Sequence, residues 1–108
     1  MIIPINSHRC INMLTKSERI KLRSMAQTLP DLVYIGKDGV TDNVLRQVED
    51  NLYAHELIKI KVQATCDEDK ESIADTICQE LDCDIVTIIG TKIVVYKLSD
   101  KKNIKHVL

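Results

Sequence analysis

Apolar residues recur at helical spacing in three segments of the chain. The first follows Thr15, which begins a capping box, and ends before Pro30, a residue that stops a helix. The second follows Thr41, a hydroxyl residue suited to capping, and ends near His55. The third covers about residues 68–81. The pattern therefore predicts three helices.

Strand-like patterns lie between and after these helices. The run "LVYIG" is apolar throughout, which predicts a strand buried on both faces. The run "ELIKIKVQA" alternates, which predicts one buried face and one face that carries Lys59 and Lys61. The run "DIVTIIGTKIVVYKLS" predicts a β-hairpin around Gly90-Thr91, because glycine first in a two-residue loop fits a type II′ turn.

The resulting order is αβαβαββ, which indicates the α/β class. Strands separated by helices imply parallel pairing, and the hairpin adds an antiparallel pair. We therefore expect a four-stranded mixed sheet packed with three helices. A chain of 108 residues suits one domain. We expect it to span residues 14–98, with an N-terminal tail or arm at residues 1–13 and a C-terminal tail at residues 99–108.

Charge is unevenly distributed although the net charge is only −1. Half of the 16 acidic residues fall between Asp67 and Asp84, where Lys70 is the only basic residue. Outside that segment, 14 Lys and Arg residues stand against eight Asp and Glu residues. This asymmetry favours one face for a polyanion and another turned away from it, although lopsided charge also occurs without a function.

A glycine loop, Gly36-Lys37-Asp38-Gly39, joins the first strand to the second helix. Glycines before a helix N-terminus let backbone amides approach a phosphate, and Lys37 adds a charge. The loop is neither a P-loop nor a dinucleotide-binding fingerprint. A purely structural turn is the alternative, and Asp38 would repel phosphate unless it points away.

Further basic residues extend this candidate phosphate site if they converge near the loop. The basic residues of the first helix, Lys16, Arg19 and Arg23, could instead form a solvated face. The candidates are Lys16, Arg19, Arg23, Lys59, Lys61, Lys92 and Lys97, with Thr41 at the start of the second helix. Three tyrosines without Phe or Trp offer no platform for several splayed bases. Backbone and shape recognition of structured RNA fits better.

Other chemistries find little support in the sequence. The four cysteines lack the paired spacing of a zinc site and are expected to be reduced thiols. No hydrolase, metalloprotease or Cys/His pattern is present, so we expect no enzyme, no cofactor and no metal. No membrane-length apolar run or signal peptide is evident, which favours a soluble cytoplasmic protein with no membrane partner.

The chain resembles a known family in four ordered segments. These are "LTKSERIKLRSMAQTL", "VYIGKDGVTDNVLRQVEDNL", "HELIKIKV" and "IIGTKIVVYK", within about residues 14–98. Together they resemble the YhbY family of single-domain CRM (chloroplast RNA splicing and ribosome maturation) proteins. At the hairpin the family often has a basic residue directly after the glycine, whereas here Thr91 precedes Lys92.

The resemblance implies a fold related to the C-terminal domain of translation initiation factor three. It implies binding of ribosomal RNA in large-subunit precursors, and a role in ribosome assembly, through Gly36–Gly39, Lys59 and Lys61. The alternative is an RNA-binding or protein-interaction adaptor in another process, such as intron splicing or translation. Ribosomal proteins are possible partners in either case.

Overall fold

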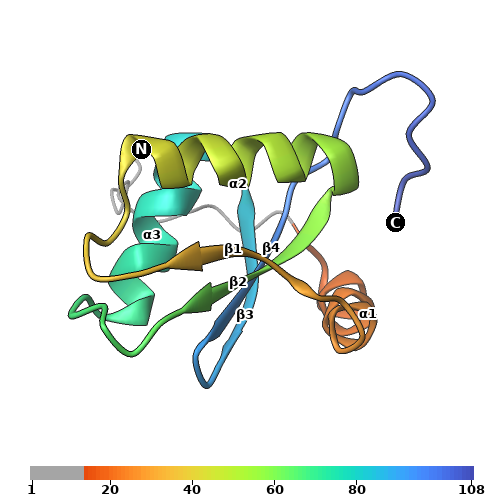
Figure 1. Ribbon diagram of the computed structural model, residues 1–108. Helices are drawn as coiled ribbons and strands as arrows, with labels where there is room; N and C mark the ends of the chain where they lie inside the picture. Colours follow the sequence, from red (N-terminus) through yellow and green to blue (C-terminus); the bar gives the residue numbers. More distant parts are fainter. Residues whose placement is uncertain (1–13) are drawn as a thin grey trace, which may run out of the picture.

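The computed structural model describes residues 14–108 (Figure 1). The elements follow the predicted order of helices and strands. They are α1 (Lys16–Ala26), β1 (Asp31–Ile35), α2 (Asp42–His55), β2 (Leu57–Val62), α3 (Lys70–Leu81), β3 (Asp84–Ile89) and β4 (Lys92–Tyr96). The predicted α/β class, with three helices and a four-stranded mixed sheet, is therefore confirmed.

Local sequence signals explain where the first two helices begin. Thr15 accepts a hydrogen bond from the Glu18 N–H, and the Glu18 side chain accepts one from the Thr15 N–H, as a capping box requires. Thr41 accepts a hydrogen bond from the Val44 N–H at the start of α2. Thr41 is therefore a helix cap in addition to any other role.

The sheet has the strand order β1-β2-β4-β3. β1 pairs in parallel with β2, while β4 pairs antiparallel with both β2 and β3. The β3–β4 connection is a two-residue turn in which Gly90 has a φ of 58°. That positive φ explains why glycine occupies the first turn position.

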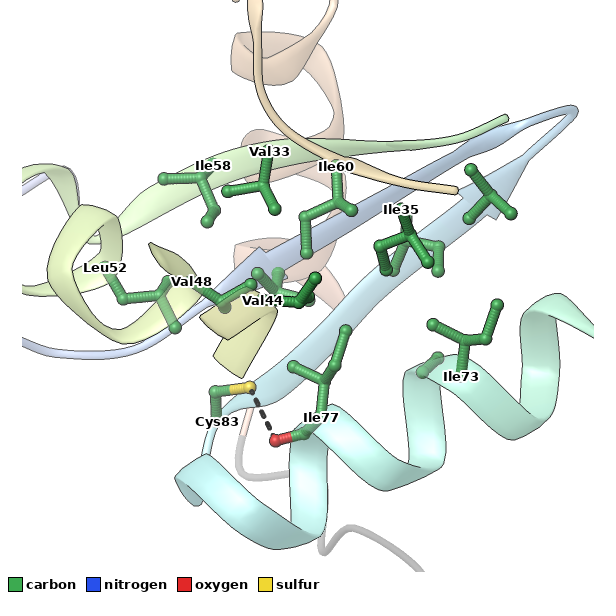
Figure 2. Close-up of a cluster of buried hydrophobic side chains, with 14 residues drawn as sticks. Val33, Ile35, Val44, Val48, Leu52, Ile58, Ile60, Ile73, Ile77 and Cys83 are labelled. Atoms are coloured by element: carbon green, nitrogen blue, oxygen red, sulfur yellow. Dashed lines mark hydrogen bonds between the residues drawn. The ribbon is translucent and has the colours of Figure 1, made fainter. Parts of the chain in front are cut away.

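Helices cover the two faces of the sheet unequally (Figure 1). α2 and α3 pack on one face, where Val33, Ile58 and Ile60 from the sheet face Val48 and other core residues (Figure 2). α1 packs alone on the opposite face, over a smaller buried cluster formed by Leu22, Ala26, Leu57, Val86, Val94 and Tyr96. Part of that second face is not covered by any helix of residues 14–108.

Burial on both faces, predicted for the first strand, is wrong. In β1, Val33 and Ile35 are fully buried, but Leu32 and Tyr34 are exposed. β1 is an edge strand, and α1 packs over residues of β2, β3 and β4 rather than over β1. The exposed side of β1 therefore borders the uncovered part of the sheet.

The C-terminal segment is tied to the domain through Glu56. This residue is fully buried directly after α2. Its carboxylate accepts hydrogen bonds from the N–H groups of Ser99 (2.8 Å) and Val107 (3.0 Å). It also lies 2.6 Å from His106 Nδ1. Residues 99–108, predicted as a tail, are thus anchored at both ends, whereas the predicted tail at residues 1–13 lies outside the described residues.

Among the described residues, the half-buried Cys66 and the buried Cys83 form no disulfide. Burial raises the pKa of the Cys83 thiol to about 12, so this thiol stays protonated. Cys78 is disulfide-bonded, so the expectation of reduced thiols is wrong for this residue. Cys10 lies outside the described residues.

Membrane-length helices are absent from residues 14–108: none combines the length and the apolar character that a bilayer span requires.

Candidate nucleic-acid interface

Three loops lie together at one end of the strands of the sheet. The glycine loop follows β1, residues 63–69 follow β2, and the Gly90-Thr91 turn joins β3 to β4. The Gln63 N–H donates to the Ile35 carbonyl (2.8 Å), and the Val62 N–H donates to the Thr91 carbonyl (2.8 Å). The topology therefore brings the glycine loop and the hairpin turn to the end of the sheet where the basic strand β2 also ends.

The glycine loop is a closed turn with an exposed tip. The Gly39 N–H donates to the Gly36 carbonyl (3.0 Å), and Gly39 has a φ of 69°. Gly39 is buried, and a Cβ built on it would clash with Glu68 Oε1. Lys37 and Asp38 at the tip are exposed. The Gly39 amide is thus already used within the turn, and the Glu68 side chain lies against Gly39.

The uncovered part of the α1 face carries most of the basic residues that the sequence placed on the strands. Register partners Tyr34, Lys61, Lys92 and Ile89 form a row across all four strands, and Lys59 lies two residues before Lys61 on β2. We call these five residues the open sheet face. Tyr34 and Ile89 are more than half exposed, at 52% and 55%. The face therefore places lysines between two exposed apolar side chains.

Only part of this positive charge is neutralised. Lys92 Nζ lies 2.7 Å from Asp31 Oδ2 and 2.9 Å from Asp31 Oδ1. Lys59 and Lys61 form no hydrogen bond or ion pair with any other described residue through their side chains. Lys61 stands directly opposite Lys92 on the antiparallel partner strand, a like-charge arrangement that costs stability. An anionic ligand would relieve this repulsion.

Two of the candidate basic residues of α1 remain exposed. Lys16 and Arg23 lie on the same helical stripe as Arg19, whose side chain reaches β3. Arg19 Nη1 donates to the carbonyls of Ile85 (2.6 Å) and Val86 (2.7 Å). Its Nη2 is buried and makes no hydrogen bond within residues 14–108. Arg19, expected at the RNA interface, therefore joins α1 to the sheet instead.

Replacing Arg19 with methionine is expected to lower the free energy of unfolding by about 2 kcal/mol, because two partly buried carbonyls lose a charged donor. Chemical denaturation checks this value. The matched control is Arg23→Met, since Arg23 is exposed on the same stripe and should change stability by less than about 0.5 kcal/mol. Equal stability of Arg19→Met and wild type would contradict the assignment.

Lys97 also departs from the expected cluster. Its Nζ donates to the Leu81 carbonyl (2.8 Å) at the C-terminal end of α3. Successive residues of a strand point to opposite faces, and Tyr96 belongs to the cluster under α1. Lys97 is thus on the α2–α3 side, where a cation stabilises the carbonyl end of a helix.

Sequence reasoning missed two participants on or beside the open sheet face and one buried site. The apolar run "LVYI" concealed the exposure of Tyr34, and Asp31 gave no sign that it would pair with Lys92 across β2. Glu56 also went unnoticed, although an acid between a helix and a strand is a visible irregularity. Tyr34 is the only aromatic residue in an otherwise aliphatic run, and this difference could have indicated that its side chain is exposed.

Metal-ligating residues do not gather within the part of the chain that the structure describes: no group of three or more His, Cys, Asp or Glu side chains there could hold an ion. The arrangement on the open sheet face instead offers ammonium groups and one aromatic ring. Such groups bind anions and flat apolar rings.

Comparisons with known proteins identify the family of the chain. The family model of the CRS1/YhbY (CRM) domain matches residues 14–97. The chain is 40% identical over 87 residues to YqeI of Bacillus subtilis, named a probable RNA-binding protein, covering 81% of this chain and 91% of that protein. It is 34% identical over 92 residues to a protein of Haemophilus influenzae named an RNA-binding protein, covering 85% and 93%.

A solved structure is also similar. The solution structure of SAV1595 from Staphylococcus aureus, titled as a candidate RNA-binding protein, superposes with a TM-score of 0.72. The two chains are 34% identical, and the match covers 84% of this chain and 95% of SAV1595. Because the family model spans most of the chain and both the sequence and the fold agree with relatives, the chain belongs to the CRS1/YhbY (CRM) domain family.

Proposed function

We propose that this protein binds RNA without catalysing a reaction, and that its target is ribosomal RNA in precursors of the large ribosomal subunit, whose assembly it assists. The observation that carries the proposal is the row Tyr34–Lys61–Lys92–Ile89 with Lys59 beside it. The family membership and the relatives named as RNA-binding proteins support the same ligand class.

Phosphate neutralisation is the proposed basis of affinity. Lys59 and Lys61 have no acidic partner among the described residues, so their charges are available to a polyanion. Lys37 follows Tyr34 by three residues, so its Cα lies within about 11 Å of the Tyr34 Cα. Lys16 and Arg23 on α1 can extend the contact. The glycine loop contributes Lys37 at its tip rather than an amide cradle, because Glu68 lies against Gly39.

The distribution of acids supports this orientation. α3 carries exposed Glu71 and Glu80 and packs on the face opposite α1. An RNA strand on the open sheet face is therefore separated from these carboxylates by the sheet. Asp38 and Asp67–Asp69 are exceptions, since they lie in the glycine loop and in the loop beside Gly39, and they limit how far the RNA extends in that direction.

Reversing two lysines of the open sheet face is expected to weaken RNA binding roughly 10- to 100-fold, because two attractions become repulsions. The variant is Lys59→Glu with Lys61→Glu. The slope of log affinity against log salt should flatten by about 1.4 to 1.8, the contribution of two phosphate contacts. Gel-shift titrations of a large-subunit ribosomal RNA fragment at several salt concentrations measure both quantities.

The matched control reverses two basic residues on the other side of the sheet, Arg46→Glu in α2 with Lys70→Glu in α3. It changes the net charge by the same amount and should leave the slope unchanged. Equal weakening in both variants would show that binding depends on net charge alone and would contradict the proposed face.

The ribosomal target has its own test. Sucrose-gradient fractionation of cell extract at low salt should place the protein with large-subunit precursors, and the Lys59→Glu/Lys61→Glu variant should move to the top of the gradient. Wild-type protein found only at the top in low salt would contradict a role in ribosome assembly and would leave RNA binding in another process, such as splicing or translation.

A further inference from the structure

Tyr34 is an exposed ring in the interior of a strand. Its neighbours Val33 and Ile35 are fully buried, so the backbone on both sides of Tyr34 is fixed by the core (Figure 2). The Tyr34 side chain points to the other face, where it is 52% exposed. No hydrogen bond to its hydroxyl is formed within residues 14–108. The strand thus fixes the backbone of Tyr34, while about half of the residue stays exposed.

The surroundings of Tyr34 differ from those of the other two tyrosines. Tyr96 is 7% exposed and belongs to the cluster under α1, and Tyr53 lies on α2 beside a separate pocket lined by Leu81 and Leu98. Tyr34 instead has Lys61 as its register partner, and Lys61 has no anionic partner among the described side chains. An exposed aromatic residue and a lysine without an anionic partner therefore lie side by side on adjacent strands, whose backbones are about 5 Å apart.

We propose that Tyr34 is the stacking platform for one unpaired nucleotide, whose base lies on the ring while a neighbouring phosphate meets Lys61. This inference rests on the proposed RNA binding and adds the kind of RNA that the open sheet face selects. A base inside a continuous duplex keeps both faces covered by its neighbours, whereas a bulged or single-stranded base can turn out and stack on an aromatic side chain. The site therefore prefers RNA with an unpaired nucleotide.

The row also limits the number of bases. Tyr34 and Ile89 stand at opposite ends of the four-stranded row, about 14 Å apart at the usual strand spacing. The two positions between them are Lys61 and Lys92, which cannot stack a base. The row thus offers one aromatic platform followed by two cations, an arrangement for one splayed base and the phosphates that follow it.

Affinity for two RNA probes tests this inference. The probes are a uridine-rich single-stranded RNA and a fully paired RNA duplex of equal length. Tyr34→Leu should weaken binding of the single strand roughly 5- to 140-fold, the range for one lost base–aromatic stack, and leave its salt slope unchanged. Tyr34→Phe keeps the ring and should bind as wild type does. Tyr34→Leu should leave duplex binding unchanged.

Tyrosine fluorescence gives a second readout, because the chain has no tryptophan. In a Tyr53→Phe background, the remaining exposed tyrosine is Tyr34. Stacking of a base on its ring should quench the emission when the single strand is added, and Tyr34→Phe in the same background should remove the quenching. The duplex should quench little.

The possible results separate the two proposals. If wild type binds neither probe and also fails to bind the large-subunit ribosomal RNA fragment, the proposed function itself is overturned; if it binds that fragment alone, only the stacking inference is overturned. If wild type binds both RNAs with a salt-dependent affinity while Tyr34→Leu binds the single strand as tightly, only the stacking inference is overturned. If Tyr34→Leu weakens affinity for the single strand and for the duplex equally, the stacking inference is also overturned, because the ring would then contribute without regard to base pairing.

Discussion

Replacing Glu56 with alanine is expected to lower the free energy of unfolding by about 3 kcal/mol and to release residues 99–108 from the domain. The carboxylate is fully buried and accepts hydrogen bonds from the N–H groups of Ser99 and Val107. Alanine removes the acceptor and leaves both donors without a partner unless the segment detaches. Stability and attachment of the segment should therefore be lost together.

The same carboxylate makes the stability of the domain depend on pH. Burial by itself would raise the pKa of Glu56, but the hydrogen bonds from Ser99, His106 and Val107 hold that pKa below its usual value of 4.5. A lowered folded-state pKa means that the stabilisation is complete above pH 4.5 and is lost as pH falls through the lower folded-state value. Glu56→Gln should lose this acid dependence, since an amide does not titrate in that range.

Urea denaturation between pH 3 and pH 7 measures both effects, and amide hydrogen exchange at Ser99 and Val107 reports release of the segment. Glu49→Ala, which removes an exposed acid from α2, is the matched control and should change stability by less than about 0.5 kcal/mol. Glu56 has a φ of 67°, so Glu56→Gly should be less destabilised than Glu56→Ala by about 1 kcal/mol. Retained exchange protection in Glu56→Ala would contradict the anchoring role.

The second large effect is expected at Ile60. Replacing it with alanine should destabilise the domain by about 3 to 4 kcal/mol, through the lost transfer energy and the cavity that remains. Ile60 is fully buried in β2, opposite Val33 on one neighbouring strand and Ile93 on the other. It faces α2 and α3 in the larger core cluster (Figure 2). Core residues from three strands thus meet at this position, which leaves little freedom to collapse.

Thermal and urea denaturation measure this loss, with Ile20→Ala as control because Ile20 is 55% exposed on α1. The control should cost less than about 1 kcal/mol. Ile60 lies directly between Lys59 and Lys61 in sequence, so Ile60→Ala also tests whether RNA affinity depends on the strand being held rigid. A destabilisation below about 1 kcal/mol would show that the cluster repacks around the missing atoms.

Much of the fold could be predicted because local signals agreed with the tertiary structure. Thr15 and Thr41 cap the helices that they were expected to cap, and the alternation in β2 placed Ile58 and Ile60 in the core. Gly90 has the positive φ that its turn required. In β1 the same reasoning was wrong, because apolar character alone does not reveal that α1 stops short of an edge strand.

The candidate site was harder to predict, since it depends on which partners the long basic side chains contact in the folded protein. Lys59, Lys61 and Lys92 come together because strand register brings them together, and alternation carries that information. Arg19 and Lys97 are equally basic, yet they satisfy backbone carbonyls at β3 and at the end of α3. Those carbonyls become neighbours only in the folded chain, so no pattern in the sequence separates structural cations from ones available to a ligand.

The outer strands of the sheet have a consequence for association between molecules. Register is interrupted in β1 between Asp31 and Val33, and in β3 between Ile85 and Thr87. At β3 the guanidinium of Arg19 also occupies the Ile85 and Val86 carbonyls. Such interruptions bend a strand away from the flat ladder on which a strand from another copy could align. The geometry of these two margins thus discourages the edge-to-edge aggregation to which small sheets are prone.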